Sequence, residues 1–156
     1  MIKNPYSKYI SGRFKNQWIK KKKIETLDLV ITGIKFGVGK RENKIGAFIL
    51  SCWSQDYKYF IEVCSVGTGI NEENINLLTK KFIHMRNNLN NKITLENPNI
   101  VIEIGFDKIT KNNKTNKFSL RFPRIINIRY DKNINDADSI NKLEKIYIIQ
   151  NINIKN

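Results

Sequence analysis

The chain of 156 residues is 40% hydrophobic and 10% aromatic and has a formal net charge of +14 at pH 7, which excludes a disordered chain and allows one domain with a real core. It contains no run of 18 apolar residues and no apolar leader, so the sequence predicts a cytoplasmic protein without a membrane partner. The excess of cations predicts a polyanionic partner, nucleic acid above all.

Cations gather at the start of the chain, where no acidic residue precedes Glu25. Residues 1–23 contain Lys3, Lys8, Arg13, Lys15 and the run from Lys20 to Lys23. A solvated face normally mixes both signs of charge, so this placement favours contact with phosphate. A compositional origin stays open, because the whole chain is rich in Lys, Ile and Asn.

Three strands are predicted in the first half of the chain. Residues 27–36 mix β-branched and apolar side chains and end at the glycine-rich turn of residues 37–40. Residues 45–53 and 57–66 follow as two further apolar runs, separated by a short polar stretch around Asp56. Together these runs predict a hairpin or a meander.

The cysteines and the histidine do not predict a catalytic or metal centre. Cys52 and Cys64 lie inside the apolar runs without metal-ligand spacing, so we expect reduced thiols in the core. The single histidine, His84, has no Asp, Ser or Cys motif nearby and is assigned no catalytic role.

A helix is predicted over residues 72–85. Asn71 is a suitable N-cap, and two glutamates follow in the first turn, where the helix dipole favours acids. The residues that recur at helical spacing and would face a core are Ile75, Leu78 and Phe82.

The second half of the chain returns to strand structure. Residues 97–109 alternate apolar side chains, and the polar residues 110–117 predict a loop. The segment KFSLRFPRIINIRYDK, residues 117–132, predicts one further strand, which carries Arg121, Arg124, Arg129 and Lys132. So many cations in a strand either decorate a solvated face or are directed at phosphate.

The chain closes with a second predicted helix, and the whole pattern predicts a fold class. Residues 138–150 form a capped amphipathic helix with an apolar stripe, and residues 151–156 are expected to fray. The stripe consists of Ile140, Leu143 and Tyr147.

The predicted fold class is all-β with minor α, namely an OB-fold: a five-stranded antiparallel Greek-key barrel with one helix between its middle strands and one at the C-terminus. From pattern alone, the prediction ends at a basic barrel that binds nucleic acid through a grooved, charged face.

Four blocks of sequence follow one another in an informative order. They are DLVITGIKFGVGKRENKIGAFILSCW (28–53), with a Gly-x-Gly-Lys-Arg turn between strands; CSVGTGINEENINLL (64–78), with Gly-Thr-Gly ahead of a helix; IVIEIGFDKI (100–109); and SLRFPRIINIRYDK (119–132), with Arg-Phe-Pro-Arg followed by Arg-x-Asp-Lys. In this order they resemble the C-terminal OB domain of ATP-dependent DNA ligases, most closely the archaeal and related bacterial form. The resemblance runs from residue 1 to about residue 150.

The N-terminal stretch resembles the end of the nucleotidyltransferase domain of the same family. MIK (1–3) matches the end of a Glu-Gly-hydrophobic-hydrophobic-Lys motif, and WIKKK (18–22) matches Trp-hydrophobic-Lys-x-Lys. The resemblance implies that Lys3, Lys20 and Lys22 surround the nucleotide phosphates. Arg13 lies one residue before the position of a family arginine, which is Phe14 here. By this resemblance, residues 1–24 end the adenylation domain and residues 25–150 form the OB domain.

The resemblance also implies a reaction and its requirements, ATP, Mg²⁺ and nicked double-stranded DNA. In such ligases, which serve DNA replication, repair and recombination, an enzyme lysine attacks ATP, AMP passes to the 5′-phosphate of a nick, and the 3′-hydroxyl displaces AMP. Arg129, Asp131 and Lys132 are implied to reach over the nucleotide and to orient its β- and γ-phosphates, and Asp131 is expected to orient Lys132 or its neighbour.

The motif of the nucleophilic lysine, Lys-x-Asp-Gly-x-Arg, does not occur in the sequence. We therefore expect the chain to correspond to the last quarter or so of a ligase. It would depend on the nucleotidyltransferase and DNA-binding half of that enzyme as a partner.

Several assignments stay open at this stage. Arg121 and Arg124 contact DNA phosphate or form interdomain salt bridges, whereas residues 122–123 are expected to serve packing and a turn. Lys40 and Arg41 suit the DNA backbone and suit a solvated turn equally. For the whole chain, the alternatives are a stand-alone OB module that binds DNA without catalysis, and an RNA ligase or capping-type enzyme. The LRFPR and GTG blocks favour a DNA ligase over the latter.

Overall fold

The computed structural model describes residues 2–3, 18–19, 24–39, 42–85 and 91–152. Five strands form the main sheet in the order β10-β7-β3-β4-β5, and every pair of neighbours is antiparallel. Their bounds are β3 Glu25–Phe36, β4 Ile45–Trp53, β5 Phe60–Val66, β7 Val101–Phe106 and β10 Arg124–Ile128. The short strand β6, Lys92–Thr94, pairs with the end of β3. No helix in the described ranges is long and apolar enough to cross a membrane.

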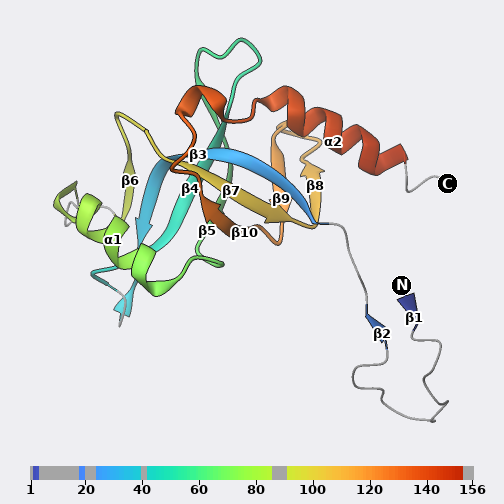
Figure 1. The fold of residues 1–156 in the computed structure, drawn as a ribbon. Helices are drawn as coiled ribbons and strands as arrows, with labels where there is room; N and C mark the ends of the chain where they lie inside the picture. Colours follow the sequence, from blue (N-terminus) through green and yellow to red (C-terminus); the bar gives the residue numbers. More distant parts are fainter. Residues whose placement is uncertain (1, 4–17, 20–23, 40–41, 86–90, 153–156) are drawn as a thin grey trace.

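This topology is the predicted OB-fold barrel. The first strand, β3, pairs with both the second and the fourth strand of the five, and the fifth strand, β10, lies beside the fourth (Figure 1). The helix α1 falls between the third and fourth strands of the five, as expected for this fold class. The prediction of the fold class is therefore confirmed.

The Gly-Thr-Gly segment after β5 brings the two edges of the sheet together. The N–H group of Ile125 in β10 donates to the carbonyl of Thr68 at 2.9 Å. A Cβ atom on Gly69, which has φ +92°, would lie 2.2 Å from the carbonyl oxygen of Ile125, and one on Gly67 would lie 2.1 Å from the carbonyl oxygen of Gly46. Only glycine permits both approaches, so the block has a structural reason to be there.

The prediction of a single strand over residues 117–132 is wrong. The segment forms two strands in different sheets: β9, Phe118–Arg121, pairs with β8, Lys108–Lys111, whereas β10 joins the main sheet. The break falls at Phe122, which has φ +51° and is 63% exposed, followed by Pro123, which lacks an N–H group. A left-handed residue before a proline cannot continue a β-ladder. Phe122 thus serves the turn but not the core packing that was expected.

Both predicted helices are present, at opposite ends of the barrel (Figure 1). The helix α1, Glu72–Phe82, is capped by Asn71, whose side chain accepts from the N–H group of Asn74, and a 3-10 turn η2, Ile83–Met85, extends it. The helix α2, Ile140–Ile152, follows the 3-10 turn η3, Ile134–Asp136. Leu143 is its buried residue, and Ile140 and Tyr147 pack against the core as predicted.

The core lies between the sheet and the inner faces of these helices. Its largest fully buried side chains include Phe48, Phe106 and Leu27, and Leu78 and Phe82 of α1 pack against the same cluster. The main sheet thus supplies most of the buried apolar surface that stabilises the domain.

Both cysteines are free thiols, as expected, and burial raises the pKa of Cys52 and of Cys64 to about 12. Thiols whose pKa values lie this far above neutral pH remain protonated and unreactive.

Two short segments precede the barrel. The strand β1, Ile2–Lys3, pairs with β2, Trp18–Ile19, in an antiparallel ladder that places Lys3 opposite Trp18.

The expected strand at residues 57–66 starts later than predicted, at Phe60, because Ser54 organises a turn ahead of it. The Ser54 hydroxyl accepts from the N–H groups of Lys58 and Tyr59 at 3.1 and 3.2 Å.

Candidate functional site

Four charged side chains meet where β3 passes the end of β10. Lys132 donates to Asp28 at 2.6 Å, and Arg129 reaches the same carboxylate at 3.2 Å. Arg129 also makes a two-pronged contact with Asp131, at 2.9 Å from Nε and 2.7 Å from Nη2. We call these four residues the Asp28 cluster. It contains two cations and two carboxylates, so its formal charges balance.

Asp28 is the member that sequence reasoning missed. It sits in β3 among buried Leu27 and Leu29, where a lone acid in an apolar strand gave no indication of a site. Its side chain is 13% exposed, and its cationic partners are 101 and 104 residues away in sequence. A buried carboxylate requires a cation or hydrogen-bond donors, and this rule was the available signal.

The backbone around Asp28 is fixed by Asp138. The N–H group of Asp28 donates to Oδ2 of Asp138 at 2.8 Å, and the N–H group of Asp138 donates to the carbonyl of Asp28 at 2.8 Å. Trp53 secures the same segment: its indole N–H donates to the carbonyl of Ile134 at 2.7 Å, and its backbone N–H donates to the carbonyl of Asp138 at 3.0 Å. The connection between β10 and α2 is therefore tied to β3 and β4.

Contacts within the Asp28 cluster shift the pKa values of Arg129, Asp131 and Lys132 in the directions that favour the charged forms. The hydrogen bond from Arg129 lowers the pKa of Asp131 to about 2, and the same bond raises the pKa of Arg129. The hydrogen bond to Asp28 raises the pKa of Lys132. All three groups thus stay ionised through the physiological pH range.

Asp131 orients Arg129 rather than Lys132. From the sequence, Asp131 was expected to orient Lys132 or its neighbour. In the structure, the Asp131 carboxylate accepts two hydrogen bonds from the side chain of Arg129. The Arg129 and Lys132 side chains are 23% and 28% exposed, so both are held and yet remain reachable from solvent. A pair of cations arranged in this way is suited to a polyphosphate.

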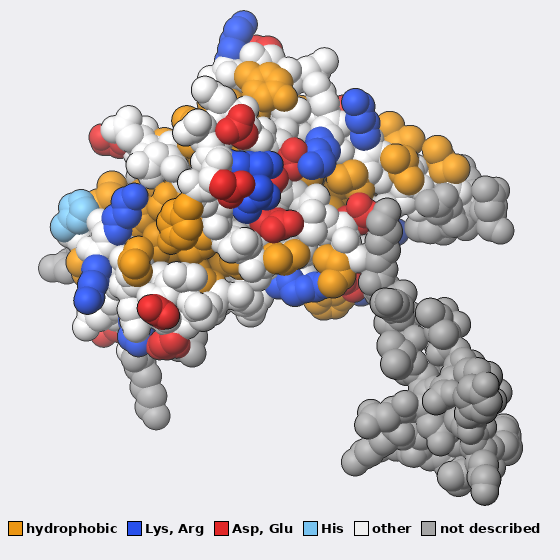
Figure 2. Space-filling model, viewed as in Figure 1, with side chains coloured by type: hydrophobic (Ala, Val, Ile, Leu, Met, Phe, Trp, Pro, Cys, Tyr) orange, Lys and Arg blue, Asp and Glu red, His pale blue; other side chains and the backbone are white. Residues whose placement is uncertain are grey.

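The surface around the cluster mixes both signs. In Figure 2, basic and acidic side chains alternate near the middle of the face, where Figure 1 places β3. Apolar side chains flank this zone on the same face. The site is therefore a compact charged patch rather than part of a broad positive field.

The structure separates Arg121 and Arg124 from this cluster. Arg124, in β10, lies 3.8 Å from Asp107, and the guanidinium of Arg121, at the end of β9, lies 5.1 Å from the ring centre of Phe122. Both arginines and the exposed ring thus come from the β9–β10 connection. Sequence reasoning had assigned Phe122 to packing and so missed an exposed aromatic side chain between two arginines.

The structure does not describe the side chains of the other predicted site residues. Lys3 is described only through its backbone, in β1. The remaining ones lie outside the described residues: Arg13, Lys20, Lys22, Lys40 and Arg41.

The carboxylates of the Asp28 cluster do not offer a metal site. Asp28 and Asp131 both accept hydrogen bonds from Arg129 or Lys132, which occupy the oxygen atoms that a divalent cation would need. Within the part of the chain that the structure describes, no group of three or more His, Cys, Asp or Glu side chains is placed to hold a metal ion.

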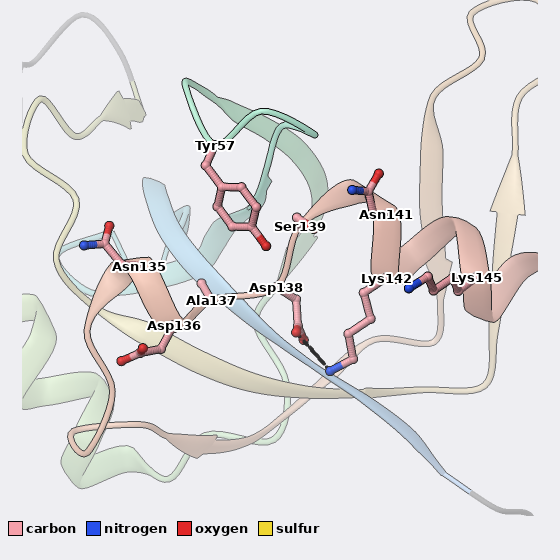
Figure 3. Close-up of a pocket in the computed structure, with 9 residues that line it drawn as sticks. All are labelled: Tyr57, Asn135, Asp136, Ala137, Asp138, Ser139, Asn141, Lys142 and Lys145. Carbon is pink, nitrogen blue, oxygen red and sulfur yellow. Dashed lines mark hydrogen bonds and ion pairs between the residues drawn. The ribbon is translucent and has the colours of Figure 1, made fainter.

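A shallow pocket of about 450 Å³ adjoins the cluster through Asp138. Figure 3 shows Tyr57 projecting from the β4–β5 turn over the segment between η3 and α2, with Lys142 reaching back to Asp138. The ammonium of Lys142 lies 2.8 Å from that carboxylate. Because this pair neutralises itself, the pocket has no charge preference that would identify a ligand.

Comparisons with known proteins agree on one family. Residues 41–132 match the family model described as "ATP dependent DNA ligase C terminal region". The match ends at Lys132 of the Asp28 cluster and includes both β9 and β10.

Curated relatives are similar over almost the whole chain. A DNA ligase of Methanococcoides burtonii is 38% identical over 152 residues, which is 96% of this chain and 27% of the relative. DNA ligase 2 of Methanosarcina acetivorans is 39% identical over 150 residues, 94% of this chain and 26% of the relative. The chain thus spans about a quarter of the length of the curated relatives that it matches.

Solved structures support the fold. The ligase domain from M. tuberculosis LigD superposes with a TM-score of 0.57 at 20% identity, covering 84% of this chain and 44% of that one. A mycobacterial DNA ligase D complexed with ATP and MES gives a TM-score of 0.53 at 18% identity, covering 84% of this chain and 43% of that one. At these identities the likeness concerns the architecture alone.

Proposed function

Because the chain belongs to the family of ATP-dependent DNA ligase C-terminal regions, we propose that it is the OB-fold part of an enzyme that seals nicks in duplex DNA through enzyme–AMP and DNA–adenylate intermediates. The observation that supports the proposal best is the Asp28 cluster, where Arg129 and Lys132 lie on one carboxylate at 3.2 and 2.6 Å. Two cations held this close together fit the phosphates of a nucleotide.

In the first step, Arg129 and Lys132 hold the β- and γ-phosphates so that pyrophosphate departs in line with the attacking lysine. Charge builds on the phosphate oxygens as the bond to the α-phosphate breaks, and fixed cations in a closed site stabilise that charge strongly. Asp131 keeps the Arg129 guanidinium in a defined plane through two hydrogen bonds. Asp28 keeps both cations together until phosphate oxygens replace its carboxylate as their partner.

ATP and Mg²⁺ are the proposed substrate and cofactor. The cations of the Asp28 cluster fit the polyphosphate, but its carboxylates are already hydrogen-bonded and do not fit the metal ion. We therefore assign Mg²⁺, which neutralises phosphate charge in this chemistry, to the nucleotidyltransferase part of the ligase.

The N-terminal residues belong to that other part in this proposal. Residues 1–24 complete the adenylation domain, and residues 25–150 form the OB domain. The phosphate-facing residues of the former would be Lys3, Arg13, Lys20 and Lys22. The ladder between β1 and β2, which brings residue 3 opposite residue 18, supports a shared origin of the two segments.

A second surface of the OB domain faces the nicked duplex. Arg121, Arg124 and the exposed ring of Phe122 form one part of it, since arginines contact phosphates and an exposed apolar ring can lie against the minor groove. Lys40 and Arg41, which follow β3 in the sequence, are proposed for the DNA backbone as well. The nucleotidyltransferase and DNA-binding half of the ligase is the partner that both surfaces require.

The curated relatives reported above are DNA ligases, which favours this function over a stand-alone DNA-binding module and over an RNA ligase or capping-type enzyme.

A fused ligase tests the proposal. The chain replaces the matching C-terminal quarter of the Methanococcoides burtonii DNA ligase, and two reactions are measured: transfer of labelled AMP from ATP to the enzyme, and sealing of a nick that already carries AMP. We expect R129A/K132A to slow the first reaction at least about 100-fold, the range seen when electrostatic stabilisers are removed, and the second less than about threefold. The chain by itself forms no AMP adduct.

The matched control is K142A, which removes a cation close to the cluster but outside it. It is expected to leave both reactions within about twofold, in the range of a surface charge. Equal slowing of both reactions by R129A/K132A would contradict a role at the nucleotide phosphates, and an AMP adduct on the chain alone would contradict the division of labour.

A further inference from the structure

A second group of cations lies on the hairpin formed by β8 and β9. Residues 108–121, which we call the basic hairpin, contain no acidic residue. They contain five cations: Lys108, Lys111, Lys114, Lys117 and Arg121. Sequence reasoning singled out only the last of these and treated residues 110–117 as a loop.

The basic hairpin has an inward and an outward face. Ile109, Phe118 and Leu120 point inward and are 0 to 8% exposed. There Phe118 meets the ring of Tyr147 in α2 at 5.5 Å, and Gln150 of α2 accepts from the N–H group of Ile109. The outward face therefore carries the alternating positions, which are Lys108, Thr110, Ser119 and Arg121.

Two like charges face each other across this outward face. Lys108 and Arg121 are direct partners in the antiparallel register of β8 and β9. Like charges at such positions repel and reduce the stability of a sheet. Asp107 next to them lies 3.8 Å from Arg124. Phosphate oxygens between the two cations would remove the repulsion, which is a reason for the arrangement to exist.

The tip of the basic hairpin holds its lysines in a defined turn. The Asn112 side chain accepts from the N–H groups of Lys114 and Thr115 at 2.8 and 3.1 Å, and the Asn112 N–H donates to the carbonyl of Lys117 at 2.9 Å. Asn116 adopts φ +56° and donates to the carbonyl of Asn112. The tip thus presents Lys114 and Lys117 from a built turn rather than from an irregular loop.

Five lysines elsewhere in the described chain have a carboxylate partner. Carboxylates lie within 3.6 Å of the ammonium groups of Lys44, Lys58, Lys92, Lys132 and Lys142. In the basic hairpin, no lysine forms an ion pair with a carboxylate of the described residues, and Lys111 instead lies over the ring of Phe118 at 5.2 Å. A solvated protein surface normally mixes both signs, so this acid-free hairpin requires another explanation.

We propose that the outward face and tip of the basic hairpin bind the phosphate backbone of duplex DNA through Lys108, Lys114, Lys117 and Arg121. The inference rests on the proposed function, since it names the surface that holds the nicked duplex away from the Asp28 cluster. Duplex is favoured over single-stranded nucleic acid because Phe118, the aromatic residue within 108–121, faces inward and offers no ring for base stacking. The exposed ring of Phe122, which follows Arg121, is assigned to the minor groove of the same duplex.

The test compares two triple variants of the 156-residue chain by fluorescence anisotropy with a labelled nicked duplex. K108Q/K114Q/K117Q removes three hairpin charges, and K58Q/K80Q/K81Q removes three exposed charges from α1 and from the turn before β5. Binding is measured from about 50 to 200 mM NaCl, because each phosphate contact contributes about 0.9 to the slope of log affinity against log salt.

For the hairpin variant, we expect the magnitude of the slope to fall by about 2 to 3 and the affinity at the lowest salt to fall at least about tenfold. For the control variant, the magnitude of the slope should fall by less than about 1. Replacing the same lysines by arginine restores binding. Urea unfolding verifies that each variant folds, which is expected because Lys114 and Lys117 are exposed and Lys108 is only partly buried.

Equal loss in the two triple variants would overturn the proposal, because net charge alone would then explain binding. The proposal would also be overturned if the unsubstituted chain did not bind duplex DNA. The same holds if the hairpin substitutions weakened binding to a single-stranded probe more than binding to the duplex. These outcomes leave the role of Arg129 and Lys132 untouched, because AMP transfer by the fused ligase tests that role without DNA.

Discussion

The two groups of cations in this domain are built in opposite ways. In the Asp28 cluster, Arg129 and Lys132 have carboxylate partners at 2.6 to 3.2 Å and are about three-quarters covered. In the basic hairpin, the cations lie at the surface, and two of them, Lys108 and Arg121, face each other in the ladder. The first group is neutralised by carboxylates of its own fold, and the second is the one that we propose binds the phosphates of a partner.

Each group suits a different recognition task. Carboxylate partners fix the direction of Arg129 and Lys132, which suits a reaction where phosphate oxygens must be met at defined positions. Cations without such partners keep their charge available and tolerate many arrangements, which suits a repeating backbone whose sequence is not read. Substituting residues in the two groups should therefore change stability in opposite directions.

The largest effect is expected for D28N. Asp28 is the shared partner of two largely covered cations, so its removal leaves both with reduced compensation. Losing one partner of a fully buried pair costs roughly 3–5 kcal/mol, and for this partly exposed cluster we expect about 2 kcal/mol of unfolding free energy. Urea unfolding measures it, with E62Q as the control for an exposed pair, where a change below about 0.5 kcal/mol is expected.

A smaller effect is expected for K132M, which keeps the aliphatic stem and removes the ammonium group. We expect this change to lower the free energy of unfolding by about 1 kcal/mol. A double-mutant cycle with D28N should give a coupling energy of similar size, because the Lys132 ammonium lies 2.6 Å from the Asp28 carboxylate. Additive losses in the cycle would show that the contact between Asp28 and Lys132 does not stabilise the domain.

For K108Q the sign reverses. Removing one of two facing cations should raise the free energy of unfolding by about 0.3 kcal/mol in low salt, because the repulsion across the ladder disappears. The gain should vanish in about 1 M NaCl, where the screening length is about 3 Å. A clear loss of stability in low salt would mean that Lys108 has a stabilising partner, which contradicts the contrast between the two regions.

The smallest effect concerns pH. Arg129 lowers the pKa of Asp131 from 3.8 to about 2. The contribution of the Arg129–Asp131 pair to the free energy of unfolding is therefore fully present above pH 3.8 and disappears as the pH falls through 2. Carboxyl NMR of the folded chain should give a midpoint near 2 for Asp131, which should move upward in R129M. A midpoint near 3.8 in the unsubstituted chain would contradict the observed two-pronged contact.

Most of the barrel was predictable because its signals are local. The strand at Ile45–Trp53 is a continuous apolar run bounded by polar residues, and the helix after Asn71 has a cap and an acidic first turn. The segment of residues 117–132 was predicted wrongly because its composition is that of one strand. The left-handed backbone at Phe122, which divides it, leaves no mark in the hydrophobic pattern.

The candidate site was predictable only in part, for a different physical reason. Arg129, Asp131 and Lys132 were found through a short motif, and their roles at a nucleotide stay predictions. Asp28 was missed because its partners are about a hundred residues away, and no local pattern reports a contact across that distance. The basic hairpin was missed because, in a chain rich in Lys, Ile and Asn, an acid-free stretch with several lysines looks like an ordinary loop until its two faces are known.

The reciprocal hydrogen bonds between Asp28 and Asp138 have a consequence for biosynthesis. The two residues are 110 positions apart, so a ribosome that adds about 5–20 residues per second releases the second roughly 5 to 20 seconds after the first. During most of that interval β3 is present without the two cations that hold the Asp28 carboxylate and without Asp138, which fixes the Asp28 backbone. A chain that ended just before residue 138 would contain every strand of the barrel and all four members of the Asp28 cluster, but it would lack the two hydrogen bonds with which Asp138 fixes the backbone of Asp28.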